Sequence, residues 1–279
     1  MAQAHANGID LEYESLGSDR DPPLLLIMGL AAQMIVWPDE FCRLLVARGH
    51  RVIRYDNRDV GLSTKPAGYY TLEDMADDAA GLLDALDLSS AHVVGASMGG
   101  FIAQLLALRH PQRVRSLALM MTSTGNRDVG YAAPDILPML LTPLPSERAA
   151  HIEHRLAMAR RLASTAYPFD EPRVRATIAA AFDRCYFPLG GQRQLAAVAG
   201  AADRTERLSE IRVPTVVIHG GDDPIVHPSG GEALARAIPG ARLHLFTGMG
   251  HDLPLALWPT FADAIIDSAR RAEGLTHHD

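Results

Sequence analysis

A serine lies between small residues at the end of an apolar run, where residues 91–100 read AHVVGASMGG. The stretch from Gly95 to Gly99 fits the pattern Gly-x-Ser-x-Gly, and the residues after it have helical periodicity. A strand–turn–helix of this kind holds the serine in a strained, exposed position where its hydroxyl can act as a nucleophile. Glycines beside it allow neighbouring backbone to pass close to the turn. We therefore predict that Ser97 is a catalytic nucleophile and that Gly95 and Gly99 form its elbow. The alternative is a glycine-rich junction with an idle serine.

The base that activates this hydroxyl must be a histidine within hydrogen-bond reach. The chain has 12 histidines. His251 is favoured because it lies in a glycine-rich loop after the apolar run 243–246, at what would be the carboxyl edge of a sheet. His219 ends the preceding apolar run and is a weaker rival, whereas His244 lies inside a predicted strand and is interpreted as packing.

An acid is needed to fix the tautomer of this histidine and to stabilise its charged form. Asp222 and Asp223 both follow the apolar run Thr215–Ile218. One of them would serve the turn before Pro224, which is a common role for aspartate. We favour Asp223 as the acid and keep Asp222 as the alternative.

Two N–H donors are needed to hold the negative oxygen that develops during attack on a carbonyl group. The first is expected from Met98, directly after the nucleophile. The second is expected from Leu30, in the loop after the apolar run Leu24–Met28. Both roles belong to the backbone, so the side chains at these positions matter little.

The elements that would gather these groups follow from the hydrophobic pattern. Near-continuous apolar runs are typical of strands that are covered on both faces, as in a parallel sheet. Such runs lie at Leu24–Met28, Arg51–Tyr55, His92–Ala96, Leu117–Met121, Thr215–Ile218 and Leu243–Phe246. Amphipathic helices alternate with them, and one is predicted to begin after Thr71 with Asp74 completing a capping box. The alternation predicts the α/β class, with a mostly parallel, doubly wound sheet.

The alternation stops between about residues 122 and 208, where prolines precede a helical stretch without strand-like runs. We predict an inserted, mostly helical cap over residues 123–208, called the helical insertion below. Residues 1–122 and 209–279 would form the two parts of the core. Within the helical insertion, His151 and His154 have no third metal ligand beside them, so we expect a solvated helix face rather than a metal site.

Composition limits the classes of partner. The 279 residues carry a net charge of −7 and only two cysteines. The charge argues against nucleic acid or an anionic membrane surface as the main partner, and the length suits one large domain.

A secretory signal and a membrane-spanning stretch are not evident, so a cytoplasmic protein is expected. The glycine motifs of nucleotide cofactors do not occur, and we expect neither an organic cofactor nor a metal. The oligomeric state stays open.

The segment from Tyr55 to Ser63 reads YDNRDVGLS and contains three charged residues. Asp56, Arg58 and Asp59 could contact a substrate. We interpret them instead as a scaffold of hydrogen bonds within the loops.

Over nearly its full length the chain resembles the α/β-hydrolase superfamily, and within it the aclacinomycin methylesterase group of carboxylic-ester hydrolases. The order of serine, aspartate and histidine along the chain matches that superfamily. The stretches that carry the resemblance are LLLIMG, WPDEF, VIRYDNRDVGLST, AHVVGASMG, PTVVIHGGDDPI and GMGHDLP. They are collinear and long.

The resemblance implies that Ser97, Asp223 and His251 form a catalytic triad and that Leu30 and Met98 supply the oxyanion donors. Many α/β-hydrolases have His-Gly in the oxyanion loop, whereas this chain has Met28 before Gly29, a departure that the methylesterase group shares. Leu30 stands where that group prefers glycine, which implies a narrower acyl side of the pocket.

These observations lead us to expect an enzyme that hydrolyses a small, moderately hydrophobic carboxylic ester through an acyl-enzyme. The same triad would also serve a cofactor-free perhydrolase or haloperoxidase, a lactonase or amidase, or a hydrolase of carbon–carbon bonds. A non-catalytic ligand-binding member of the fold is the remaining alternative. It is disfavoured because all three triad residues are present.

Overall fold

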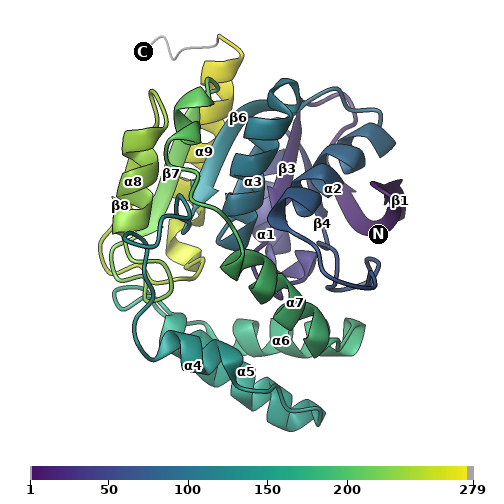
Figure 1. The fold of residues 1–279 in the computed structure, drawn as a ribbon, viewed down its shortest axis with the longest axis vertical. Helices are drawn as coiled ribbons and strands as arrows, with labels where there is room; N and C mark the ends of the chain where they lie inside the picture. Colours follow the sequence, from purple (N-terminus) through teal and green to yellow (C-terminus); the bar gives the residue numbers. More distant parts are fainter. Residues whose placement is uncertain (1, 275–279) are drawn as a thin grey trace.

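A single sheet of eight strands runs through the computed structural model, which describes residues 2–274 (Figure 1). The strand order is β1-β2-β4-β3-β5-β6-β7-β8. The strands from β4 to β8 in this order pair in parallel, whereas β2 is antiparallel to both β1 and β4. Their bounds are Ala2–Ala6 (β1), Ile9–Leu16 (β2), Pro23–Ile27 (β3), Arg51–Tyr55 (β4), Ala91–Ala96 (β5), Val114–Met120 (β6), Thr215–Gly220 (β7) and Arg242–Phe246 (β8). The predicted α/β class and mostly parallel sheet are confirmed, and each of the predicted strands is present.

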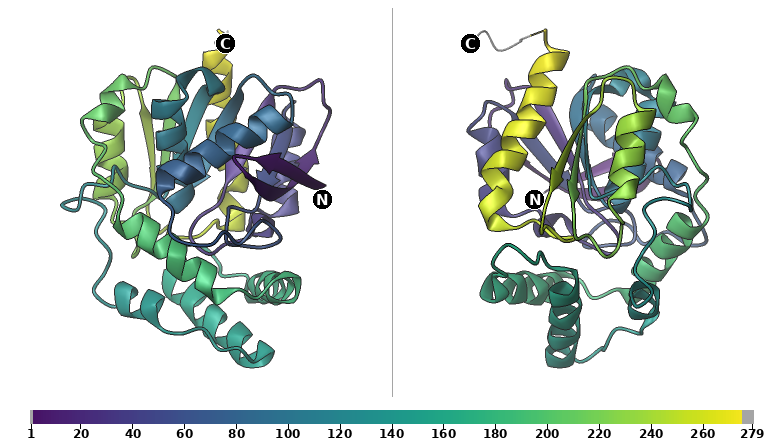
Figure 2. Two further views of the ribbon diagram at one scale, coloured as in Figure 1. Left: turned by 45° about the vertical axis from the view of Figure 1, so that its right-hand side comes forward. Right: turned by 90° about the vertical axis from the view of Figure 1, so that its left-hand side faces the viewer.

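Helices cover both faces of the sheet (Figure 2). Successive side chains of a strand point to opposite faces, so a strand covered on both faces must be apolar throughout. In β3, Leu24 and Leu26 pack in the cluster that includes α1 and α9, whereas Leu25 and Ile27 pack in the cluster that includes α2, α3 and α8. The helices span Asp39–Val46 (α1), Leu72–Ala85 (α2), Met98–Arg109 (α3), Ser229–Ala237 (α8) and Trp258–Ala272 (α9). None of the helices within residues 2–274 has the length and apolar character needed to span a membrane.

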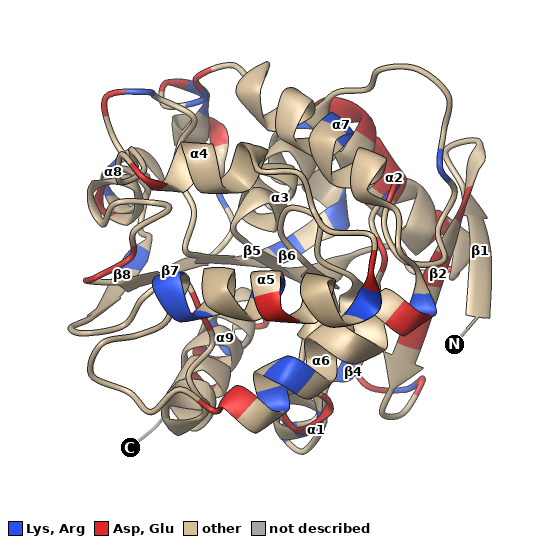
Figure 3. Ribbon diagram, turned by 90° about the horizontal axis from the view of Figure 1, so that it is seen from below, with Lys and Arg blue, Asp and Glu red and all other residues tan. Residues whose placement is uncertain are grey.

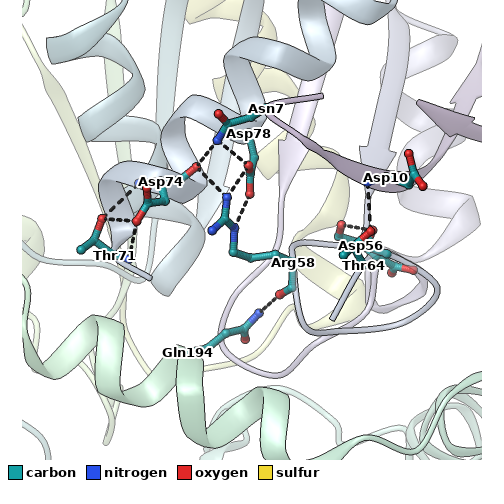
Figure 4. Close-up of polar contacts among 10 residues, drawn as sticks. Asn7, Asp10, Asp56, Arg58, Thr64, Thr71, Asp74, Asp78 and Gln194 are labelled. Atoms are coloured by element: carbon teal, nitrogen blue, oxygen red, sulfur yellow. Dashed lines mark hydrogen bonds and ion pairs between the residues drawn. The ribbon is translucent and has the colours of Figure 1, made fainter. Parts of the chain in front are cut away.

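The start of α2 follows the expected pattern. Thr71 Oγ1 accepts a hydrogen bond from the N–H of Asp74 at 3.2 Å, and Asp74 Oδ2 accepts one from the N–H of Thr71 at 2.8 Å (Figure 4). These two bonds satisfy donors that a helix start otherwise leaves free. The predicted capping box is confirmed.

The N-terminal hairpin was not predicted. Strands β1 and β2 are joined at Asn7 and Gly8, whose φ angles are 50° and 77°. Asn-Gly is the sequence typical of a two-residue hairpin turn because both positions need positive φ. The Asn7 side chain also donates to Asp78 Oδ1 at 2.9 Å, which ties the hairpin to α2 (Figure 4).

The helical insertion lies beyond the carboxyl edge of the sheet (Figures 1 and 2). Between β6 and β7 the described chain forms no strand, and it forms the helices Ile136–Leu141 (α4), Arg148–Leu162 (α5), Glu171–Arg184 (α6) and Pro188–Ala199 (α7). Viewed from that side, α5 and α6 lie in front of the sheet (Figure 3). The expected helical character is therefore confirmed, whereas the boundaries of 123–208 stay a prediction.

The charged segment after β4 is a hydrogen-bonded scaffold. Buried Asp56 accepts from the N–H of Met34 at 2.8 Å and from the N–H of Leu62 at 2.9 Å. The same carboxylate pairs with Arg184 of α6 at 2.5 Å, which fastens the helical insertion to this loop. Asp59 pairs with Arg193 of α7 at 3.1 Å. The interpretation of this segment as a scaffold is confirmed.

Arg58 and Asp78 form a buried ion pair that joins this scaffold to α2 (Figure 4). Arg58 Nε and Asp78 Oδ2 are 2.6 Å apart, and their side chains are 8% and 2% exposed. A buried charge that loses its partner is strongly destabilising because it has lost its water as well. We expect Arg58→Met to lower the free energy of unfolding by about 3–5 kcal/mol, measured by urea denaturation.

The control is Arg109→Met. It removes a partner of Asp77, which lies on α2 next to Asp78. That pair is also close, at 2.7 Å, but its side chains are 38% and 29% exposed. Exposed pairs contribute at most about 1 kcal/mol. Equal losses of unfolding free energy in the two variants would show that burial is not the reason why the Arg58–Asp78 pair stabilises the fold.

Candidate active site

Ser97 lies at a sharp turn between β5 and α3. Its φ and ψ are 55° and −121°, a backbone conformation that residues other than glycine rarely adopt. Two hydrogen bonds hold the turn: the N–H of Ser97 donates to Met120 O at 2.9 Å, and its carbonyl accepts from Gly100 N–H at 2.9 Å. Ser97 is partly exposed, whereas the residues on either side are buried. The strand–turn–helix thus presents the hydroxyl and hides its surroundings.

The elbow depends on its glycines. A Cβ atom at Gly95 would lie 2.2 Å from Gly99 O, and one at Gly99 would lie 2.1 Å from Ile27 O. Neither position has room for a side chain. A Cβ at Gly29 would lie 3.0 Å from the Cβ of Ser97 and 3.5 Å from its Oγ, so the loop after β3 passes directly beside the hydroxyl.

The two expected oxyanion donors belong to the two segments next to Ser97. Met98 is the first residue of α3, and such an N–H has no partner inside its own helix. Leu30 follows Gly29, in the loop that contacts Ser97. Both donors therefore belong to segments that touch the serine.

His251 and Asp223 are in direct contact. His251 Nδ1 lies 2.7 Å from Asp223 Oδ2, and the side chain of Asp223 has no exposed surface. Asp223 Oδ1 accepts from the N–H groups of Ile225 and Val226, at 2.9 and 2.8 Å. A carboxylate with this set of partners accepts only, so Nδ1 of His251 carries the proton and Nε2 has a free lone pair.

The alternative acid, Asp222, has a different role. It is exposed, and its Oδ2 accepts a hydrogen bond from Thr165 Oγ1 in the helical insertion. The side chain that orients His251 is therefore that of Asp223. Within the described chain, Ser97 Oγ makes no hydrogen bond to the His251 ring, a bond that in unliganded enzymes is often long and tightens only when substrate binds.

The loop that carries His251 is held from two sides. At Gly220 a Cβ would lie 2.3 Å from Met249 O, so the loop passes over the end of β7 where no side chain projects. From the helical insertion, Leu162 O accepts from the N–H of His251 at 2.8 Å. Ser164 Oγ donates to Asp252 Oδ1 at 2.5 Å and accepts from Gly250 N–H at 3.1 Å.

The rival histidines pack elsewhere. His219 is fully buried; its Nε2 donates to Val226 O at 2.8 Å, and burial lowers its pKa. Its Nε2 also lies 3.7 Å from Asp223 Oδ2, which is the oxygen that His251 contacts at 2.7 Å, but this nitrogen is already bonded to the Val226 carbonyl. His244 stacks on Phe246 within β8.

The expectation of a solvated face for His151 is wrong. The residue is 8% exposed and its ring packs on Phe182, with centroids 5.0 Å apart, because α5 lies against α6. His154 is partly exposed. Among the described residues, no group of three or more potential ligand side chains could hold a metal ion.

A buried glutamine supports the loop after β3, which carries the expected oxyanion donor, and sequence reasoning missed it. Gln194 of α7 accepts from the N–H of Ala31 at 2.7 Å. It also donates to Arg58 O at 2.8 Å (Figure 4). On the opposite side, Asn57 donates to Met28 O at 3.0 Å. The loop that carries Leu30 is thus held at both ends. No motif marks these residues, because their partners are distant in sequence.

Comparison with known proteins identifies the family. A model of the α/β-hydrolase fold family matches residues 22–255. The chain belongs to the α/β-hydrolase family. Rhodomycin D methylesterase DnrP of Streptomyces peucetius is 36% identical, over 95% of this chain and 96% of its own length. The 2-hydroxymuconate semialdehyde hydrolase of Pseudomonas sp. (strain CF600) is 32% identical over 90% and 88% of the two chains.

A solved structure of the same fold is the enol-lactonase of Burkholderia xenovorans LB400. Its TM-score is 0.77 at 28% identity, over 96% of this chain and 99% of that one. The resemblance to α/β-hydrolases and their methylesterases is therefore confirmed. This α/β-hydrolase shares its arrangement of strands with relatives that bear the names of different hydrolytic reactions.

The role of Gln194 leads to a prediction about the oxyanion loop. In Gln194→Met the N–H of Ala31 loses its acceptor, so the loop opens more often. Loss of one hydrogen bond costs about 1–1.5 kcal/mol. We expect amide exchange in residues 28–36 to become about tenfold faster, measured by hydrogen–deuterium exchange with mass spectrometry. The control Gln192→Met changes an exposed residue of the same helix and should leave the rate unaltered. An unaltered rate of amide exchange in both variants would refute the role of Gln194 in holding this loop.

Proposed function

We propose that this α/β-hydrolase cleaves carboxylic esters, with Ser97 as nucleophile, His251 as general base and Asp223 as its acid partner. The observation that carries the proposal is the contact of 2.7 Å between His251 Nδ1 and a fully buried Asp223. That contact leaves Nε2 as the basic nitrogen. The methylesterase relative supports an ester as the bond that is cleaved.

In the acylation step, Ser97 Oγ attacks the carbonyl carbon of the ester while Nε2 of His251 takes the hydroxyl proton. The carbonyl oxygen becomes negative, and the N–H groups of Leu30 and Met98 are the proposed donors to it. Asp223 stabilises the imidazolium that forms, without itself becoming protonated. The tetrahedral intermediate then collapses: its bond to the alcohol oxygen breaks, and Nε2 returns the proton to that oxygen.

In the deacylation step, water attacks the acyl carbon and gives one proton to Nε2 of His251. The second intermediate collapses with release of the acid, and the proton passes to Ser97 Oγ. Each atom and proton is then accounted for by the ester and water alone. The reaction requires no cofactor, and its partner is a small ester molecule.

The first prediction from this proposal concerns the serine. A fluorophosphonate should add its phosphonyl group to one residue, visible in the intact mass and mapped by peptide sequencing to Ser97. In His251→Ala the rate of labelling should fall by at least 10³-fold, because the hydroxyl loses its base. Label on another residue, or undiminished labelling in His251→Ala, would rule the assignment out.

A second prediction separates the two neighbouring aspartates. Asp223→Asn removes the charge that orients His251 and should lower kcat/KM for p-nitrophenyl butyrate on the order of 10⁴-fold. Asp222→Asn is the matched control, because its side chain is exposed and an amide oxygen can still accept from Thr165. We expect it to keep kcat/KM within about threefold of the unmodified enzyme. Equal losses in the two variants would contradict the proposed triad.

The relatives also favour a second candidate reaction with the same residues. The Pseudomonas relative is named as a hydrolase of 2-hydroxymuconate semialdehyde, and the Burkholderia structure as an enol-lactonase. Product analysis on a vinylogous diketone, an enol-lactone and a methyl ester would rank these reactions. A kcat/KM highest for the methyl ester is the result expected here.

A further inference from the structure

A small cavity of about 120 Å³ lies between the helical insertion and the loop after β3. Its wall is formed by α5, α6, the start of α7 and residues 31–36. Apolar and aromatic side chains predominate, including Val36, Ile178 and Phe187. A cavity of roughly 150 Å³ holds one benzene ring, so this space suits a small ring or a branched chain.

The cavity is close to the proposed nucleophile. Ala31 forms part of its wall, and Gly29 contacts Ser97. Consecutive Cα atoms are about 3.8 Å apart, so Ala31 is within about 7.6 Å of Gly29. The same loop therefore contacts the serine at Gly29 and forms the cavity wall at Ala31.

Most polar side chains in the wall are already engaged within the protein. Each of the following bonds to a backbone carbonyl: Gln33 to Ala181 and Cys185, Thr177 to Arg173, Tyr186 to Leu144, and His151 to Pro145. These bonds shape the cavity and leave those donors occupied.

Arg155 is the exception. It lies on α5, four residues after His151 and on the same helix face, and it lines the cavity. The residue is half-buried, and its guanidinium makes no hydrogen bond or ion pair with any residue in the described part of the chain. Burial lowers its pKa, and no neighbouring acid offsets that effect. A guanidinium remains charged at neutral pH all the same.

The other arginines of α5 and α6 have carboxylate partners. The pairs are Arg148–Asp183, Arg160–Glu171, Arg161–Asp135, Arg173–Glu40, Arg175–Glu153 and Arg184–Asp56. Basic and acidic residues both lie on these helices (Figure 3). The one cation of this set that lacks a carboxylate in the described chain is also one that faces the cavity.

We propose that Arg155 binds an ionised carboxylate of the substrate, so that the preferred ester carries a second, free acid group on a small apolar or aromatic unit. This inference rests on the proposed function and specifies its substrate class. The guanidinium fork matches a carboxylate with two parallel hydrogen bonds. The rings of His151, Phe182 and Tyr186 pack against one another at tilted to edge-on angles, with centroids 4.9–5.4 Å apart, and give the cavity an aromatic side.

Binding of small acids tests the site without any reaction. Benzoate and benzamide have nearly the same shape and differ in charge. With the intact protein, we expect isothermal titration calorimetry to give a Kd for benzoate at least tenfold below that for benzamide. In Arg155→Met the ratio should fall to within twofold, and Arg155→Lys should retain part of it, because lysine keeps the charge and loses the fork.

The matched control for binding is Arg148→Met. It removes a cation from the same helix at an exposed, ion-paired position, and the tenfold preference should persist. Circular dichroism checks that each variant is folded. Equal affinities for the two probes in the unmodified protein, or a preference that survives in folded Arg155→Met, would overturn the proposal.

Hydrolysis tests the same residue with substrates. Monomethyl esters of straight-chain dicarboxylic acids with four to eight carbons are compared with methyl esters that end in an isopropyl group instead of the carboxylate. At the best length, the ratio of kcat/KM for acid over neutral ester should drop at least tenfold in Arg155→Met and stay unaltered in Arg148→Met. If benzoate is preferred through Arg155 but no ester is hydrolysed, the proposed function fails and the anion site stands.

Discussion

One buried carboxylate determines the geometry of the whole site. Asp223 has no contact with solvent, so its charge must be balanced by hydrogen bonds, and the fold supplies them from Ile225, Val226 and His251. Because two of these donors are backbone groups of its own turn, one carboxylate oxygen is left for the histidine. The ring of His251 then has a fixed tautomer and a fixed direction. Gly220 completes the arrangement, because the histidine loop passes where a side chain would otherwise lie.

The helical insertion is joined to both parts of the candidate active site. Ser164 binds the loop that carries His251, and Gln194 binds the loop that carries Leu30. A displacement of these helices would therefore disturb the proposed base and the proposed oxyanion donor together. Arg184 and Arg193 add ion pairs to Asp56 and Asp59 in the scaffold after β4. These contacts balance the charges of the two buried scaffold aspartates.

The parts of this molecule that local sequence patterns determine were predictable, and the parts that depend on distant contacts were not. Apolar runs predicted the parallel strands, and the residues around Ser97 predicted the strand–turn–helix there, because both features depend on residues that are neighbours in the sequence. The choice between Asp222 and Asp223 needed the structure, since both follow β7 and only the turn decides which one faces His251. Gln194 acts across more than 160 residues and carries no motif. The hairpin at Asn7 and Gly8 did have a local signal, the Asn-Gly pair, that was overlooked.

The unpaired state of Arg155 has a consequence for ligand binding. Arg184 also lies near the cavity wall, but an anion bound there would have to compete with Asp56, which already holds that guanidinium. Within the described residues, an anion that binds Arg155 has no carboxylate to displace. It gains the attraction of a charge in surroundings of low polarity, where Coulomb energies are several times larger than in water. The folded protein carries the cost of an unpaired, half-buried cation in the free state, and a bound carboxylate removes that cost. The charge is therefore better suited to recognition than to stability.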